Sequence, residues 1–169
     1  VAASIQRNYI FERIILFIKR MIYPKSDRII AISNGVKISL VDKLSIDSKM
    51  INVIYNPAAD EKIIDLSQEF TDDYSFKNYT IVNIGRLTKQ KDHLTLLKAF
   101  KLVIKKTKCN LLIIGEGSEK ENIKNYIRNN DLENHVKMLG YKSNPWKYLS
   151  KSNLFVLSSI WEGFGNVIV

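Results

Sequence analysis

Residues 79–117 read YTIVNIGRLTKQKDHLTLLKAFKLVIKKTKCNLLIIGEG, and this stretch contains the pattern that decides the fold. It opens with β-favouring residues over 79–84, continues with apolar residues at helical spacing over 92–106, and returns to a continuous apolar run over 111–114. A run without polar alternation is typical of a strand that is buried on both faces of a sheet. We therefore predict a strand, a crossover helix and a second strand parallel to the first.

The same alternation continues toward the end of the sequence. Ser118, with Glu121 three residues later, predicts a capping box at the start of another helix, and residues 135–139 predict another strand. An Asn-Pro pair at 144–145 predicts the start of a short helix, and residues 154–157 predict a last strand. Strands and helices that alternate in this way predict an α/β fold with a parallel sheet, whose ligands bind at the carboxyl ends of the strands.

The region before residue 79 is predicted to contain less regular elements. They are a helix over 9–22, a strand over 28–32, a helix that Ser33 caps and that runs through Leu44, a strand over 51–55, and a helix over 61–70. After the Asn-Pro turn of residues 56–57 the sequence becomes more polar and its pattern less regular, which predicts a domain boundary. We therefore expect two domains, residues 1–57 and 58–169.

The composition is basic. The 169 residues include 26 Lys and Arg against 17 Asp and Glu, a formal net charge of +9. Such a balance points to a polyanionic partner, which is nucleic acid, an anionic membrane surface or phosphate. The excess is spread along the chain without any nucleic-acid-reading motif, so we expect no nucleic-acid partner. A single Cys excludes a disulfide framework, and with only two His we also expect no metal site.

The helix predicted over 9–22 is both apolar and basic. Its apolar residues recur at spacings of three and four, and they are Ile10, Ile14, Phe17, Ile18 and Met21. Two interpretations follow: the helix lies on an anionic membrane, or it packs in a core while its basic residues reach water. We favour the core helix and keep peripheral membrane contact as the alternative. No apolar stretch approaches the roughly 20 residues that span a bilayer.

Glycine follows four of the predicted strands. The four segments are Gly85-Arg86, Gly115-Glu116-Gly117, Gly140-Tyr141 and Glu162-Gly163. A residue without a Cβ allows a ligand to approach the backbone closely. Arg86 and Lys91 precede a predicted helix N-terminus, where two cations are able to converge on a phosphate. The alternative for this pair is a solvated loop that contains basic residues by chance.

The segment that follows the last predicted strand carries a stronger signal. It reads Trp161-Glu162-Gly163-Phe164-Gly165-Asn166. An acid ahead of two glycines that flank an aromatic residue predicts backbone N–H groups exposed at the start of a helix, which bind anions. The Glu162 carboxylate would then accept hydrogen bonds from sugar hydroxyl groups. The alternative is a structural turn with a capping acid.

Together these segments resemble the donor half of the group 1 glycosyltransferases, which are the large retaining family four with the GT-B fold. The order and spacing match over residues 79–169, and residues 28–57 resemble the end of that family's N-terminal domain. The resemblance implies an α/β chain of GT-B type. It would contain the last elements of a first Rossmann-like domain, followed by most of a Rossmann-like donor-binding domain with a parallel sheet.

The resemblance also implies roles for individual residues. In such enzymes Arg86 and Lys91 would hold the donor diphosphate, Glu162 would face the transferred sugar, and Tyr141 would lie in the loop that contacts the nucleotide base. The implied donor-binding residues are Gly85, Gly115, Glu116, Gly117, Tyr141, Gly163, Phe164, Gly165 and Asn166. The family's second glutamate comes eight positions after the first, so we expect Glu at the position after Val169.

The implied function is the transfer of a sugar from a nucleoside-diphosphate sugar, such as a UDP- or GDP-sugar, to a glycan or lipid-linked acceptor. The resemblance further implies retention of configuration, no metal and no cofactor, and a place in polysaccharide or lipopolysaccharide biosynthesis at the cytoplasmic side of the membrane. Most of the acceptor-side domain is not in the sequence, so we expect this chain alone to be inactive. A sugar-nucleotide epimerase, an inactive nucleotide-binding module and a nucleic-acid binder are the alternatives.

Overall fold

The computed structural model describes residues 2–57, 60–71 and 73–167, and within the first helix it describes side chains at position 11 and from 13 onward. The chain divides into two compact units. The first comprises Val1–Pro57 together with Gly163–Asn166, and the second comprises Ala58–Glu162 together with the C-terminal residues from Val167.

The first unit is built from three helical segments and a pair of strands, with a short 3-10 turn before the second strand. In chain order these are α1 (Ala2–Ile22), η1 (Tyr23–Lys25), β1 (Ile29–Ala31), α2 (Asn34–Leu44), η2 (Ser48–Met50) and β2 (Ile51–Val53). The two strands pair in parallel, with Ile29 opposite Ile51. Ser33 caps α2 as predicted, because its Oγ accepts a hydrogen bond from the backbone N–H of Val36 at 3.1 Å.

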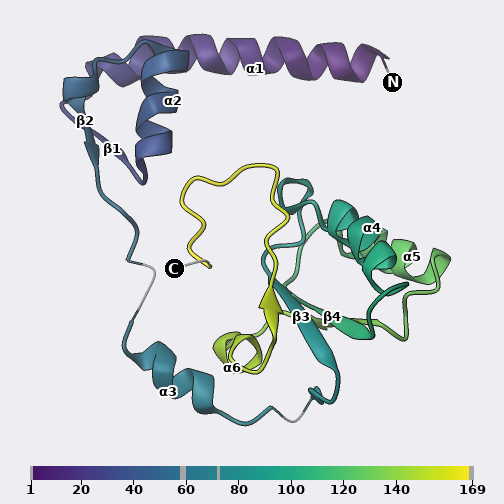
Figure 1. Ribbon diagram of the computed structural model, residues 1–169. Coiled ribbons are helices and arrows are strands. Elements are labelled where there is room, and N and C mark those ends of the chain that lie inside the picture. Colours follow the sequence, from purple (N-terminus) through teal and green to yellow (C-terminus); the bar gives the residue numbers. More distant parts are fainter. Residues whose placement is uncertain (1, 58–59, 72, 168–169) are drawn as a thin grey trace. The chain divides into compact units, whose positions relative to one another are not determined.

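The helix α1 does not pack as predicted. Ile14, Phe17, Ile18 and Met21 are all exposed, Phe17 at 64%, and the side chain of Ile10 lies outside the described residues. The interpretation as a core helix is therefore wrong for these four side chains. The reason is one of size: a helix of 21 residues is about 30 Å long, and α2 with two three-residue strands is too small to cover it (Figure 1). Within the described residues, no helix has the length and apolarity needed to span a bilayer.

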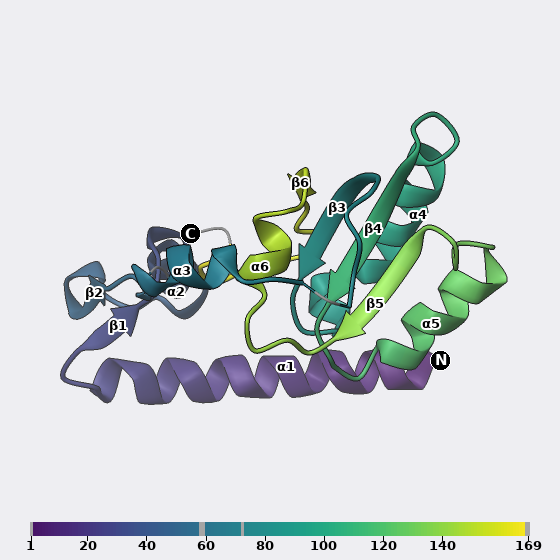
Figure 2. The same ribbon diagram turned by 90° about the horizontal axis from the view of Figure 1, so that it is seen from below.

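The second unit contains a four-stranded parallel sheet with helices on both faces. Its elements are α3 (Lys62–Gln68), β3 (Tyr79–Ile84), η3 (Lys89–Lys91), α4 (His93–Val103), β4 (Cys109–Ile114), α5 (Lys120–Asn129), β5 (Val136–Gly140), α6 (Trp146–Leu149) and β6 (Leu154–Phe155). The strand order is β5-β4-β3-β6, and Figure 2 shows β5, β4 and β3 side by side. β3 and β4 run in register from Tyr79 opposite Cys109 to Ile84 opposite Ile114.

Both faces of the central strands are buried, as the unbroken apolar runs predict. On one face, Ile81, Leu111 and Ile113 pack with residues of α4 and α5 in one core cluster. On the other face, Val82 and Leu112 pack with the fully buried Tyr148 of α6. Successive residues of a strand point to opposite faces, so each of the two clusters takes alternate residues of the same strands. The predicted α/β fold with a parallel sheet is confirmed.

Several predicted boundaries differ from the structure. Strands β2 and β6 are shorter than predicted, β4 begins two residues earlier, and α4 ends at Val103. The predicted capping box is wrong, because α5 begins at Lys120 and no side chain caps it. The backbone N–H of Glu119 instead donates to the carbonyl of Leu87 at 2.8 Å, which holds Ser118 and Glu119 in a turn before the helix starts. A tertiary contact thus overrides a local signal.

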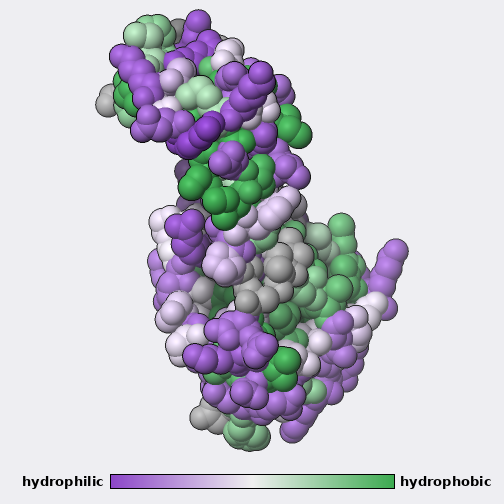
Figure 3. Space-filling view, turned by 90° about the vertical axis from the view of Figure 1, so that its left-hand side faces the viewer, coloured by the Kyte–Doolittle hydropathy of each residue, from purple (hydrophilic) through white to green (hydrophobic). Residues whose placement is uncertain are grey.

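The charged surface agrees with a positive charge that is dispersed along the sequence. Hydrophilic residues are intermixed with hydrophobic ones over the face that Figure 3 shows. Most of the ion pairs are short-range or lie at the surface, such as Lys124 with Glu121 on α5. Surface pairs of this kind contribute little to stability, so the excess of lysine does not explain the fold.

Candidate functional site

The carboxyl ends of β3, β4 and β5 are joined by a row of backbone hydrogen bonds. The N–H of Gly85 donates to Ile114 at 3.0 Å, and the N–H of Gly115 donates to Gly140 at 2.8 Å. Two residues beyond the bond between Gly85 and Ile114, the N–H of Leu87 donates to the carbonyl of Glu116 at 2.9 Å. The loops after these strands are therefore fixed to one another, and side chains that they carry are held at one edge of the sheet.

Two of the predicted glycines are required by the packing of these loops. Gly115 has φ of +151°, and a Cβ there would lie 1.9 Å from the carbonyl oxygen of Gly85. A Cβ at Gly117 would lie 2.3 Å from the carbonyl oxygen of Leu87. At Gly85, by contrast, a Cβ would make ordinary contacts with the Lys91 side chain, at 3.6 Å or more. The close approach at Gly115 and Gly117 is therefore to the protein's own backbone, and their role in donor binding stays a prediction.

A pocket of about 430 Å³ opens at this edge of the sheet. It is lined by Ile84, Gly85, Arg86, Ile114, Gly115, Glu116, Tyr141, Lys142, Ser143, Pro145 and Trp146. Five of the residues that the sequence singled out thus share one pocket: Gly85, Arg86, Gly115, Glu116 and Tyr141. The sequence reasoning missed the wall formed by residues 142–146. The Asn-Pro-Trp segment at 144–146 was the available signal, since it places an aromatic side chain after a strand end.

The wall formed by residues 142–146 is held by an acid from outside it. Asp73 accepts hydrogen bonds from the Lys142 ammonium at 2.5 Å and from the Tyr148 hydroxyl at 2.8 Å. Burial raises the pKa of the Asp73 carboxyl, but the hydrogen bonds from Lys142 and Tyr148 outweigh it and bring the pKa below its usual value. The same hydrogen bond raises the pKa of Lys142, so both partners are ionised around neutral pH.

Lys91 and Glu162, which are 71 residues apart in sequence, form an ion pair. The two side chains are only 14% and 25% exposed, respectively. The Ser159 hydroxyl donates to the same oxygen of Glu162, Oε1, at 2.6 Å. Burial raises the pKa of the Glu162 carboxyl, but the hydrogen bonds from Lys91 and Ser159 and the charges of Lys91 and Arg86 bring it below its usual value. Of the three residues predicted to be catalytic, Lys91 and Glu162 are thus in direct contact, and Arg86 acts on Glu162 through its charge.

The segment that carries Glu162 is attached to the turn that carries Lys91 by further hydrogen bonds. The Ser158 hydroxyl donates to the carbonyl of Lys91 at 2.7 Å. The N–H of Ile160 donates to the carbonyl of Gln90 at 2.8 Å, and the Gln90 side-chain amide donates to the carbonyl of Trp161 at 2.9 Å. The bond between Ile160 and Gln90 joins backbone to backbone, so the two segments are held together independently of the Lys91 and Glu162 side chains.

Residues Gly163–Asn166, directly after Glu162, belong to the first unit. The Ser33 hydroxyl donates to the carbonyl of Gly163 at 2.7 Å, and the ring of Phe164 lies 5.6 Å from that of Tyr55. The Asn56 side chain donates to that of Asn166 at 3.1 Å. Residues 163–167 form bends and a turn, and any helix that starts later lies outside the described residues. The predicted roles of Gly163, Phe164, Gly165 and Asn166 toward a donor stay predictions.

His93, the first residue of α4, is buried close to Lys91. Its side chain is 2% exposed, and neither ring nitrogen has a hydrogen-bond partner within the described residues. Burial, together with the charge of Lys91, lowers the pKa of His93 to about 4, although Asp92 acts in the opposite direction. Within the described part of the chain, no group of three or more His, Cys, Asp or Glu side chains is placed to hold a metal ion.

Comparison with known proteins places this sheet and its loops in a family. Residues 68–169 match the family model of the glycosyl transferases group 1, which is more than half of the chain. The chain therefore belongs to the group 1 glycosyltransferases.

Individual relatives agree with this assignment. The chain is 36% identical over 153 residues to N-acetylgalactosamine-N,N'-diacetylbacillosaminyl-diphospho-undecaprenol 4-alpha-N-acetylgalactosaminyltransferase of Campylobacter jejuni, an alignment that covers 90% of this chain and 40% of that protein. It is 28% identical over 146 residues to UDP-Gal:alpha-D-GlcNAc-diphosphoundecaprenol alpha-1,3-galactosyltransferase of Escherichia coli, covering 80% of this chain and 38% of that protein. The chain thus spans about 40% of the length of these relatives.

Solved structures support the same fold. The crystal structure of a variant of S. aureus TarM in complex with fondaparinux, alpha-GlcNAc-glycerol and UDP matches with a TM-score of 0.68 at 25% identity. The match covers 83% of this chain and 27% of that one. The expected GT-B type of fold is therefore confirmed.

Proposed function

We propose that this chain is the donor-binding part of a glycosyltransferase that moves a sugar from a nucleoside-diphosphate sugar to a glycan or lipid-linked acceptor. The observation that carries the proposal is the Lys91–Glu162 pair, which brings a cation suited to a diphosphate against a carboxylate suited to sugar hydroxyls. Arg86 lies in the same connection between β3 and α4 as Lys91, with its charge acting on Glu162 and its side chain lining the 430 Å³ pocket. With the diphosphate bound near Arg86 and Lys91, this pocket would hold the rest of the nucleotide.

We infer that the nucleotide is uridine diphosphate. The pocket wall offers the flat side chains of Tyr141 and Trp146, on which a base is able to stack, and Tyr141 is largely exposed. The relative from E. coli carries UDP-Gal in its name, and the TarM variant was crystallised with UDP. Asp73 and Tyr148 would keep Lys142 at the edge of this pocket through the hydrogen bonds described above.

The proposed chemistry needs a group that stabilises the leaving diphosphate. When the bond between the sugar C1 and the phosphate oxygen breaks, its electron pair stays on the diphosphate, and negative charge grows there. The Arg86 guanidinium and the Lys91 ammonium would stabilise this charge, so that no divalent metal and no cofactor is needed. The acceptor hydroxyl would attack from the face that the diphosphate leaves, pass its proton to the departing phosphate oxygen and retain the anomeric configuration.

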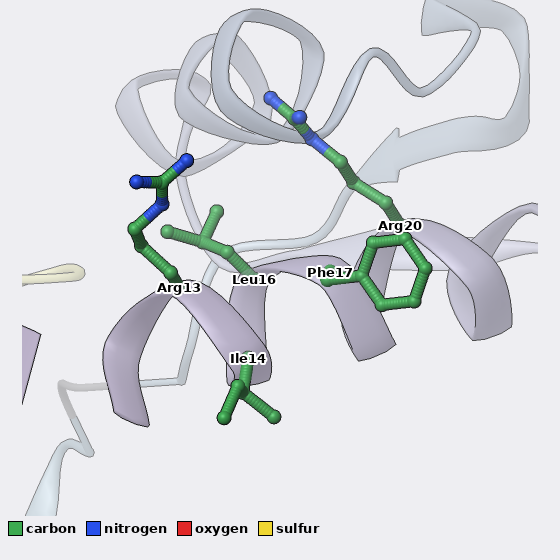
Figure 4. A pocket seen from close by; sticks show the side chains of 5 residues that line it. All are labelled: Arg13, Ile14, Leu16, Phe17 and Arg20. Atoms are coloured by element: carbon green, nitrogen blue, oxygen red, sulfur yellow. The ribbon is translucent and has the colours of Figure 1, made fainter. Parts of the chain in front are cut away.

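We further propose that the protein works at the cytoplasmic face of the membrane and touches it through α1. The helix exposes Phe11, Ile14, Phe17, Ile18 and Met21, and its last turn adds Lys19 and Arg20. A hollow of about 620 Å³ on α1 is lined by Arg13, Ile14, Leu16, Phe17 and Arg20. Figure 4 shows both guanidinium groups on one side of the helix and Ile14 on the other, although Arg20 also donates to the carbonyl of Lys43.

The membrane proposal is tested with vesicles. The complete protein should co-sediment with phosphatidylglycerol vesicles more than with phosphatidylcholine vesicles, because a basic amphipathic helix binds anionic lipid. Replacing Phe17 and Ile18 by Ser should abolish this difference, whereas the same pair of changes at Ile64 and Phe70, exposed residues of the second unit, should not. Equal binding to both kinds of vesicle would refute it.

The donor proposal is tested by calorimetric titration of UDP and GDP into the complete protein. Arg86→Ala with Lys91→Ala should weaken UDP binding by about 100-fold or more, since each hydrogen bond to a charged group contributes about 1.5–3 kcal/mol. The matched control is Lys124→Ala with Arg128→Ala, which removes the same two charges from α5 and should leave the affinity unchanged. Unchanged affinity in the Arg86 and Lys91 variant would exclude the proposed site.

Retention of the anomeric configuration and independence of a metal ion are tested by separate measurements. Proton NMR of the product should show the anomeric configuration of the donor if the enzyme retains it, and inversion would refute this part of the proposal. Transfer in excess EDTA should proceed at the rate seen with added Mg²⁺ if Arg86 and Lys91 replace a metal, whereas loss of transfer in EDTA would show that they do not.

A further inference from the structure

The Glu162 carboxylate is held asymmetrically. The Lys91 ammonium and the Ser159 hydroxyl both donate to Oε1, whereas no group within the described residues donates a hydrogen bond to the other oxygen, Oε2. A carboxylate on a flexible side chain has no fixed orientation of its own, and two donors on one oxygen define it. The sequence reasoning assigned no role to Ser159, which follows the last strand without belonging to the glycine-rich segment.

Lys91 alone is poorly suited to hold Glu162 during catalysis. In the proposed function the same ammonium faces a diphosphate with growing charge, so its three N–H donors are divided between the phosphate and Glu162. The Ser159 hydroxyl has no such second task. It lies three residues before Glu162 in the same loop, so that it moves with the carboxylate if the loop shifts.

The backbone around Ser159 is itself anchored. Its neighbour Ser158 donates to the carbonyl of Lys91, and the N–H of Ile160, on the other side, donates to the carbonyl of Gln90. Ser159 therefore sits between two residues that are bonded to the turn carrying Lys91. This gives its hydroxyl a defined position relative to both members of the ion pair.

We propose that Ser159 is a positioning residue that acts through Glu162, fixing Oε1 so that Oε2 accepts a hydrogen bond from a hydroxyl of the donor sugar. The inference rests on the proposed function, because it assigns the free oxygen of Glu162 to the sugar of a nucleotide sugar. It adds a residue outside the predicted site, and it separates the recognition of the sugar, through Ser159 and Glu162, from that of the diphosphate, through Arg86 and Lys91.

The test compares the sugar-dependent and the sugar-independent steps in the complete protein. Ser159→Ala should lower kcat/KM for hydrolysis or transfer of UDP-glucose, UDP-galactose, UDP-GlcNAc or UDP-GalNAc, whichever the wild type uses, by about tenfold, since a misplaced group costs up to about 100-fold. The Kd for UDP, which lacks the transferred sugar, should change by less than about twofold. Ser159→Thr, which keeps the hydroxyl, should restore most of the activity.

The matched control is Ser67→Ala on α3, which also removes a serine hydroxyl that donates an exposed hydrogen bond, to the carbonyl of Ile64 at 2.7 Å. It should leave kcat/KM unchanged. Equal losses in Ser159→Ala and Ser159→Thr, or a parallel loss of UDP affinity in Ser159→Ala, would overturn the positioning role. If the wild type neither binds UDP nor uses any of the four donors, the proposed function itself fails.

A second readout does not depend on turnover. The groups that face Glu162 are Lys91, Arg86 and Ser159, and all three lower the pKa of its carboxyl. Ser159→Ala should therefore raise that pKa, which a carbon NMR titration of the labelled carboxyl measures directly. The acid limb of the kcat/KM profile should move to higher pH by the same amount. An unchanged pKa would show that the Ser159 hydrogen bond does not hold the carboxylate in solution.

Discussion

The first unit and the second unit contain the same kinds of element but bury them to different degrees. In the second unit, β3 and β4 pack on both faces, and the loops at their carboxyl ends are tied together by backbone hydrogen bonds. In the first unit, α1 leaves Phe17 and three other predicted core residues exposed. Apolar periodicity therefore identifies a helix face that is able to pack, whereas the number of surrounding elements decides whether that face is buried.

The strand-end loops should be the place where a small change has the largest effect. Gly115→Ala adds a Cβ that would lie 1.9 Å from the Gly85 carbonyl oxygen at a φ of +151°. Backbone strain and overpacking each cost about 1–3 kcal/mol, so we expect a destabilisation of about 4 kcal/mol in urea unfolding.

Gly85→Ala is the matched control for this effect, because its Cβ would make only ordinary contacts. It should change the free energy of unfolding by less than about 1 kcal/mol. If both alanine variants unfolded at the same urea concentration, the close packing of the Gly85 and Gly115 loops would not exist in solution.

The contrast in burial predicts unequal costs for truncating side chains. Leu97→Ala, at a fully buried position of α4, should cost about 2–5 kcal/mol of unfolding free energy. Phe17→Ala removes a larger apolar side chain from an exposed position on α1 and should cost less than about 0.5 kcal/mol. Thermal or urea unfolding of the two variants measures the difference. A large loss from Phe17→Ala would mean that this side of α1 is covered in solution.

The buried His93 predicts a pH dependence of the second unit. Its pKa is lowered to about 4 from 6.5, so the unfolded chain takes up a proton as the pH falls below 6.5 while the folded chain does not until about 4. His93 thus costs no free energy of unfolding above pH 6.5. As the pH falls from 6.5 to 4, the free energy of unfolding drops by about 3 kcal/mol, since each unit of pKa difference corresponds to about 1.36 kcal/mol.

His93→Leu should flatten the stability profile between pH 6.5 and pH 4 without loss at neutral pH, since it removes a buried ring that has no hydrogen-bond partner within the described residues. Urea unfolding at several pH values is the measurement. Glu162 adds a smaller effect of the same sign at lower pH: its folded pKa lies below the ordinary 4.5, so its contribution is lost as the pH falls through that folded value. If the variant and the wild type lost the same free energy of unfolding between pH 6.5 and pH 4, the acid sensitivity would come from other groups.

Much of the second unit was predictable because its signals are local. The strand over 79–84 matches β3 residue for residue. In the first unit, the cap of α2 at Ser33 was likewise predicted correctly from a local signal. Five predicted site residues line one pocket because parallel strands bring their carboxyl ends to one edge of the sheet. The capping box at Ser118 failed because a carbonyl from another loop, that of Leu87, took the Glu119 N–H.

Periodicity and turn residues in the sequence are sufficient to indicate the alternation of strands and helices, the parallel sheet and the family, because these signals are local. The contacts between distant groups are visible only in the folded chain: Glu162 with Lys91 and Ser159, Asp73 with Lys142 and Tyr148, and Gly115 with the Gly85 carbonyl. The physical reason is that a side chain's partner depends on how distant segments pack. A glycine or a glutamate looks the same in the sequence whether its neighbour is a ligand or the chain's own backbone.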